Sequence, residues 1–368
     1  MAVGAVIGFH YYHWPVFGNA GVELFFVLSG FLITTLLVEE WQKFGRIGLG
    51  RFYLRRALRL FPALWVFLAV FGIVAHFSRV PRYLFLEPAI YGLTYTTNIF
   101  AATGSDVGWL PHLWSLATEE QFYLLWPLLL IVMLRRRLRL GAIVMIAAVL
   151  AAVVIVLRDV YVSGHLGYSS LAYFKFDAIL IGCIAGLLFT SRHRRSLARF
   201  CCAPPVAAVA AVSLVYLLIR PPALLSVRIG DVSWFAYWPL FNLSAAVTII
   251  WVVERCPRFA PARWLLESPP VGYVGRISYA LYLWHPFVLD WLRWPHGGNI
   301  QDSERILRPL ALAGTLIAAS ASYWLVERPF LRMKWRLSAT GSHDADASVI
   351  LRHDYEGESG PERPAGAS

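Results

Sequence analysis

Charged side chains are scarce in this sequence. Asp, Glu, Lys and Arg make up 15% of its 368 residues, whereas 58% are hydrophobic and the mean hydropathy is +0.58. A soluble domain carries about a quarter charged residues and at most about half apolar ones. The composition therefore excludes an ordinary soluble domain. The apolar stretches are continuous rather than short and alternating, which also excludes a membrane β-barrel.

Cysteine is scarce as well, and no internal repeat is visible. The four cysteines form no C-x-x-C pair, so we predict neither a zinc site nor a thiol redox motif, and no other metal site. The first nine residues are apolar and have no basic segment before them. A cleavable signal peptide would begin with such a segment. We therefore interpret these residues as part of a membrane span.

Long apolar runs dominate what is present. A bilayer-spanning helix needs about 20 mainly apolar residues, so the hydrophobic content is enough for about ten spans. The sequence predicts an all-α, polytopic integral membrane protein with about ten transmembrane helices. The predicted segments are 1–16, 21–38, 58–77, 121–134, 140–157, 176–190, 204–219, 233–253, 273–292 and 306–326.

Basic residues give the chain a formal net charge of +11. On a soluble protein this excess would suggest nucleic acid. Here the basic residues cluster between apolar runs, and 22 of the 33 lie in alternate connections, against nine in the others. The positive-inside rule produces such a split. We therefore predict both termini on the cytoplasmic side of the membrane, with no nucleic acid as partner.

Two segments are predicted to differ from the spans. The long outer connection, 78–120, is rich in Tyr and Trp, so we expect it to pack back on the bundle or to re-enter it. Residues 1–336 are predicted to form one transmembrane domain. The tail, 337–368, is rich in Gly, Ser, Ala and Pro and lacks a core-forming pattern, so we predict a disordered cytoplasmic tail.

Two histidines of the first segment are candidates for proton transfer, because imidazole titrates near neutral pH. His10 follows an unbroken apolar run and is predicted to lie at membrane depth. His13 precedes Trp14-Pro15 and is predicted to lie at the outer interface. Either could instead be a hydrogen-bonded packing residue.

Arginines gather before the third segment. Arg56 and Arg59 are three apart and should share a helix face, with Arg55 beside them. Their guanidinium groups could hold phosphates through paired hydrogen bonds at the cytoplasmic mouth. The alternatives are a topology signal or the binding of lipid headgroups.

Acidic residues are candidates at three places. Glu119 and Glu120 precede the fourth segment, at its predicted outer mouth, where a carboxylate could orient a histidine or hold a sugar hydroxyl. Helix capping within an aromatic belt is the alternative. Asp177 could be functional or could form an ion pair with Lys175, and Glu23 could simply favour a helix start.

Tyr279, Tyr282 and His285 lie roughly on one stripe of the ninth segment. His285 could face a cavity or be a satisfied core histidine.

Several strings together resemble the membrane-bound acyltransferase-3 family of O-acyltransferases. They occur in one order up to about residue 336, and the joint signal is specific although each string alone is weak. The strings are FH at 9–10, GVELFFVLSGFLI at 21–33, FYLRRALRLFP at 52–62, WSLATEEQFYLLWP at 114–127, ISYALYLWHP at 277–286 and VERPF at 326–330.

The resemblance implies a ten-helix enzyme of a bacterial cytoplasmic membrane that moves an acyl group, often acetyl, from cytoplasmic acyl-CoA to a hydroxyl. The acceptor is commonly a glycan or a lipid-linked saccharide, and other members modify related metabolites. The family's catalytic histidine falls on His10, its R-x-x-R motif on Arg56 and Arg59, and its acidic pair on Glu119 and Glu120. We assign His10 as general base or acyl carrier, the two glutamates as its helpers, and Arg55, Arg56 and Arg59 as ligands of the donor's phosphates.

Some positions depart from the family pattern. The arginine that the family places eleven positions before His10 would precede Met1, which predicts a truncated N-terminus. Glu23 stands where many members have aspartate. Some members also carry a hydrolase-like C-terminal domain, which we do not expect in this sequence.

A proton-coupled transporter of a small molecule is the alternative function, because intramembrane histidines and acids suit it. A non-catalytic membrane scaffold is a third possible function. Against a transporter, the two halves of the sequence contain no matching pair of helices broken by Gly or Pro.

Overall fold

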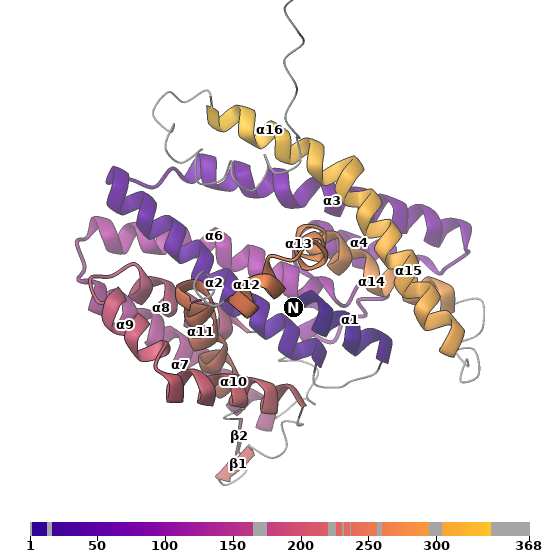
Figure 1. Ribbon diagram of the computed structural model, residues 1–368. Coiled ribbons are helices and arrows are strands. Elements are labelled where there is room, and N and C mark those ends of the chain that lie inside the picture. Colours follow the sequence, from indigo (N-terminus) through magenta and orange to yellow (C-terminus); the bar gives the residue numbers. More distant parts are fainter. Residues whose placement is uncertain are drawn as a thin grey trace, which may run out of the picture.

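The computed structural model describes residues 2–12, 17–164, 175–219, 226–229, 232–235, 237–255, 260–293 and 304–339. Each of the ten predicted apolar segments contains a helix. These helices are α1 (Ala2–Tyr12), α2 (Phe17–Phe44), α3 (Leu49–Phe77), α6 (Leu113–Arg135), α7 (Leu140–Gly164), α8 (Phe176–Phe189), α10 (Pro204–Ile219), α11 (Tyr237–Arg255), α14 (Ser278–Arg293) and α15 (Glu304–Ser322) (Figure 1).

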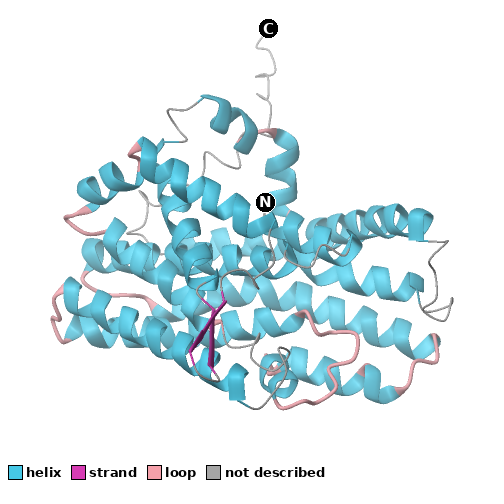
Figure 2. Ribbon diagram, turned by 90° about the horizontal axis from the view of Figure 1, so that it is seen from below, coloured by secondary structure: helices cyan, strands magenta, loops and turns pink. Residues whose placement is uncertain are grey.

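Shorter elements connect these helices. They are the 3-10 turn η1 (Arg82–Leu84), α4 (Leu86–Leu93), α5 (Thr97–Ala102), α9 (Arg194–Cys201), α12 (Ala260–Leu266), α13 (Pro269–Arg276), the π-helical turn η5 (Tyr323–Glu327) and α16 (Arg328–Ala339). One antiparallel hairpin joins β1 (Ser226–Ile229) to β2 (Val232–Phe235), with Ser226 opposite Phe235 (Figure 2). Within the described ranges, the regular structure is therefore helical apart from these two strands.

Among the described residues, six helices are long and apolar enough to cross a membrane. They are Asn19–Phe44, Leu49–Phe77, Leu113–Arg135, Leu140–Arg158, Tyr237–Arg255 and Leu307–Met333. The pair α8 and α9, bent by 120°, adds a seventh if it forms one broken span. The chain is thus a polytopic integral membrane protein, and the count of ten spans stays a prediction.

Several predicted boundaries are wrong. The third helix begins at Leu49 rather than at 58, and the fourth at Leu113 rather than at 121, because amphipathic turns precede both apolar runs. The segment predicted at 233–253 begins in β2, and its helix starts at Tyr237. The segment predicted at 273–292 is broken at Ile277 between α13 and α14.

The centre of the bundle is a close crossing of α2 and α8. A Cβ on Gly30 would lie 2.0 Å from the carbonyl oxygen of Ile179, and one on Gly182 would lie 2.1 Å from that of Val27. These backbones therefore touch, as small residues allow in membrane helix pairs. Buried side chains around the crossing form the largest core cluster, which includes Phe26, Phe31 and Trp126.

The connection between α3 and α6 packs back on the bundle. Asn98 of α5 and Gln121 of α6 exchange two side-chain hydrogen bonds of 2.9 Å, and Gln121 also donates to the backbone oxygen of Tyr95 at 2.8 Å. Thr97 and Asn98 are fully buried. This segment is therefore part of the folded domain.

The predicted disordered tail falls largely outside the described residues. Helix α16 continues to Ala339, so residues 337–339 are helical, and residues 340–368 lie outside the described ranges. His13 lies outside them as well.

Candidate active site

Three imidazole rings meet inside the bundle. His10 comes from the end of α1, His112 immediately precedes α6, and His285 lies in the middle of α14. The centroid of the His285 ring is 4.8 Å from that of His10 and 5.7 Å from that of His112. His285 is fully buried and His112 nearly so. The structure thus brings the predicted His10 next to two further histidines.

Tyr11 holds α1 against the helices that carry this cluster. Its hydroxyl lies 2.7 Å from Thr315 Oγ1 of α15 and 3.2 Å from the backbone oxygen of His285. Tyr11 is fully buried. Because Tyr11 is the neighbour of His10, this anchor sets where the His10 ring can lie.

A polar stripe on α6 leads away from the histidines. Ser115 contacts the hydroxyl of Tyr282, which donates at 2.6 Å to the backbone oxygen of His112. One turn further, Glu119 accepts a hydrogen bond from Ser29 of α2, and Ser29 also contacts the hydroxyl of Tyr123. All these groups are buried or partly buried. The stripe therefore places Glu119 on the same face of α6 as Ser115, one turn further from the histidine cluster.

Arg56 lies between both glutamates. Its Nε donates to the two carboxylate oxygens of Glu120 at 2.8 and 3.0 Å, and its Nη2 is 3.5 Å from Glu119 Oε1. The guanidinium carbon lies 3.2 Å above the ring of Tyr123. Arg56 is thus surrounded by two carboxylates and an aromatic face.

The sequence predicts Arg56 at the cytoplasmic mouth and the acidic pair at the outer mouth, but the structure places them in contact with each other. Both α3 and α6 start two turns earlier than predicted, so Arg56 and Glu120 each lie seven residues inside their helices. At 1.5 Å per residue, each lies about 10 Å along the axis from the first residue of its helix. Tyr53 also bridges the two helices, since its hydroxyl donates to the backbone oxygen of Leu124 at 3.0 Å.

Arg59 is the more accessible arginine of the motif. It is exposed, whereas Arg55 and Arg56 are both partly buried, and the side chain of Arg56 is 19% exposed. Arg56 and Arg59 therefore differ in environment although they are three residues apart.

A second group of buried charges lies where α2, α7 and α8 meet. Lys175 Nζ is 2.8 Å from Glu23 Oε1, and Arg158 Nη1 donates to the two oxygens of Asp177 at 2.9 and 3.1 Å. Asp177 therefore pairs with Arg158 rather than with Lys175. Lys175 also lies 4.1 Å above the ring of Trp238. The two positive and two negative charges balance one another.

His112 and Ser29 are not among the predicted site residues. His112, Ser115, Glu119 and Tyr123 follow one another at spacings of three, four and four, which is one face of a helix. That pattern could have identified His112. Ser29 lies among apolar residues of another helix, and nothing near it in the sequence indicates its partner.

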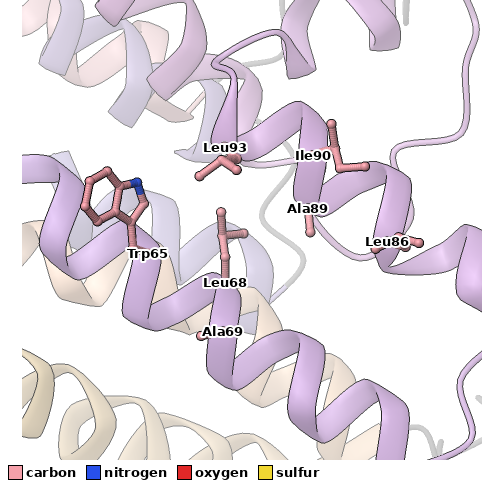
Figure 3. A pocket seen from close by; sticks show the side chains of 7 residues that line it. All are labelled: Trp65, Leu68, Ala69, Leu86, Ala89, Ile90 and Leu93. Atoms are coloured by element: carbon pink, nitrogen blue, oxygen red, sulfur yellow. The ribbon is translucent and has the colours of Figure 1, made fainter.

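Among the described residues, neither a metal site nor the apolar groove on the surface provides a second candidate for the reactive centre. Within the described ranges, no three His, Cys, Asp or Glu side chains gather so that they could hold a metal ion. An open groove of about 330 Å³ lies between α3 and α4, lined by Trp65, Leu68, Ala69, Leu86, Ala89, Ile90 and Leu93 (Figure 3). Its lining is apolar and aromatic, so it offers no general base.

The fold and these clusters define a polytopic membrane protein with titratable groups inside its helix bundle. The acyltransferase-3 family profile, described as an acyltransferase domain, matches residues 2–327. The chain therefore belongs to the acyltransferase-3 family.

The chain is similar to several curated proteins of Staphylococcus aureus. A protein of strain MRSA252 named as a putative O-acetyltransferase is 27% identical over 91% of this chain and 58% of its own length. The O-acetyltransferase OatA of strain NCTC 8325 is 29% identical over 91% of this chain and 57% of its own length. The chain spans less than two thirds of the length of the curated relatives it matches. No solved structure matches it.

Proposed function

We propose that this protein is a membrane O-acetyltransferase that moves an acetyl group from acetyl-CoA to a hydroxyl of a glycan or a lipid-linked saccharide. Family membership and the names of the relatives support this activity. The observation that carries the proposal is the His10 ring, 4.8 Å from the ring of the buried His285, in a bundle of this family. An imidazole in such a setting suits general base catalysis.

In this proposal His10 removes the proton from the acceptor hydroxyl while the oxygen attacks the thioester carbonyl. The carbon–sulfur bond breaks, and the thiolate of coenzyme A takes the proton from the imidazolium. Transient acylation of His10 is the alternative route. Glu119 and Glu120 assist from α6, where Glu119 lies one turn from Ser115, whose hydroxyl contacts Tyr282 beside the histidine cluster.

The donor's phosphates are bound by the arginines of α3. Guanidinium groups match phosphate oxygens through paired hydrogen bonds. Arg59 is exposed and Arg55 half-buried, which suits a ligand that arrives from solvent. Arg56 completes this set by holding the acidic pair beside the donor, or by exchanging Glu120 for a phosphate. Both termini are assigned to the cytoplasmic side, where acetyl-CoA is available.

Membranes that contain the full chain, supplied with acetyl-CoA labelled in its acetyl group, test the proposal. Label that becomes attached to membrane glycan or lipid, and that mild alkali releases as an ester would, supports acyl transfer. Uptake of label without covalent attachment would support the transporter instead. The absence of both covalent labelling and uptake would support a scaffold.

A further inference from the structure

His285 is held in one tautomer by its own helix. Its Nδ1 lies 2.8 Å from the backbone oxygen of Tyr282 and 3.2 Å from that of Leu281. Carbonyl oxygens only accept hydrogen bonds, so Nδ1 of the neutral ring carries the hydrogen. Nε2 is then the nitrogen with the lone pair.

This lone pair lacks a hydrogen-bonding partner. Nε2 of His285 is buried and accepts no hydrogen bond from any side chain or backbone group in the described part of the chain. Leaving a buried acceptor unsatisfied is unfavourable. An N–H donor close to this nitrogen would remove that cost.

Of His10 and His112, His10 has the ring closer to that of His285. The two rings are 4.8 Å apart between centroids and inclined by 67°, whereas the centroid of His112 is 5.7 Å away. The next residue, Tyr11, reaches the backbone oxygen of His285 at 3.2 Å. Helices α1 and α14 are therefore held in register at the level of these two histidines.

Building on the proposed function, we propose that His285 is a positioning residue for His10. Its Nε2 accepts the N–H of His10, which leaves the other nitrogen of His10 as the base. The proposed series of hydrogen bonds runs from the backbone carbonyls of α14 through His285 and His10 to the acceptor hydroxyl. This is the logic of an oriented base, in which a third group sets the tautomer of a histidine.

The proton balance needs no further reactant. The hydroxyl proton moves to His10, and His10 returns it to the sulfur of coenzyme A when the thioester bond breaks. His285 keeps its Nδ1 hydrogen throughout, and its lone pair stabilises the imidazolium of His10 while that cation exists.

Two substitutions separate positioning from packing. His285→Asn keeps a donor near the carbonyls of α14 and removes the acceptor at the Nε2 position. His285→Gln can place an amide oxygen where Nε2 was. With labelled acetyl-CoA and membranes that contain the full chain, we expect kcat of the Asn variant to fall about tenfold or more. The KM for acetyl-CoA should stay the same, and the Gln variant should recover part of kcat.

Phe287→Leu is the matched control. Phe287 is buried on the same helix and packs against Phe67 and Phe71 at ring distances of 6.1 and 5.5 Å. This change should lower the amount of folded protein without changing kcat per folded molecule.

Two results would overturn the positioning role. In the first, both His285 variants keep the wild-type kcat per folded molecule and lose only folded protein, as the control does. In the second, the wild-type protein transfers no label at all. The second result would contradict both the proposed function and the positioning role. The first would contradict the positioning role alone.

Discussion

Arg56 and Glu120 form a bidentate ion pair between α3 and α6, in which one guanidinium nitrogen lies 2.8 and 3.0 Å from the two carboxylate oxygens. The side chains are 19% and 14% exposed. Together with Tyr53, this pair connects two helices that carry different parts of the proposed site.

Breaking this pair should destabilise the protein. Removing one partner of a fully buried ion pair typically costs about 3–5 kcal/mol, because a charge is left uncompensated, and we expect a smaller loss for this partly buried pair. We expect Arg56→Ala to lower the melting temperature in detergent. Arg56→Ala combined with Glu120→Gln should recover part of the loss. A double variant that is as unstable as the sum of the two single variants would show that the residues are not coupled.

Arg59 should affect the donor rather than the fold. One charge-assisted hydrogen bond contributes about 1.5–3 kcal/mol, and about 1.4 kcal/mol is a factor of ten. We therefore expect Arg59→Ala to raise the KM for acetyl-CoA about tenfold or more while the melting temperature stays unchanged. Arg59→Lys should recover only part of the affinity, because an ammonium cannot form the paired contact. An unchanged donor KM in correctly inserted protein would refute the role in donor binding.

His10→Ala should abolish acyl transfer and leave expression and detergent stability near normal. His10 is half-buried beside His285, so its truncation removes the proposed base without opening the core. The labelled-acetyl assay measures this directly. His13→Ala is predicted to be milder. Substantial turnover by the His10→Ala protein would show that another residue is the base.

Lys175→Ala should be strongly destabilising. It leaves Glu23 fully buried without its ion-pair partner, and we expect a loss of about 3–5 kcal/mol. Adding Glu23→Gln should restore much of the melting temperature in detergent. Arg194→Ala is the matched control, since its pair with Glu254 is 53% and 23% exposed. Such a pair contributes about 0–1 kcal/mol, so equal effects of the two single changes would contradict the prediction.

Gly182→Ala should weaken the crossing of α2 and α8. The new methyl group would lie 2.1 Å from the backbone oxygen of Val27, so the two helices would have to separate. Gly72→Ala is the control, because a Cβ at this helical glycine of α3 meets nothing within 4 Å. We expect a lower melting temperature for the first variant and an equal or higher one for the second. Equal stability of both would mean that the crossing is not closely packed.

Local properties of the sequence determined much of this protein. Apolar run length placed a helix in all ten predicted segments, because a residue's preference for lipid depends on its own side chain. The family strings identified the family and pointed to His10. Helix starts were less certain, since the first turns of α3 and α6 are amphipathic and look like connections.

Only the tertiary structure decided which polar groups meet. Tyr11 reaches His285 across 274 positions of the chain, and Arg56 reaches Glu120 across 64. Asp177 pairs with Arg158 although Lys175 is closer in sequence. A run of apolar residues shows that a helix is buried in lipid or protein, but not how it is rotated. Rotation and pairing depend on how ridges and small residues of neighbouring helices fit together, as Gly30 and Gly182 do, and this information is spread over the whole bundle.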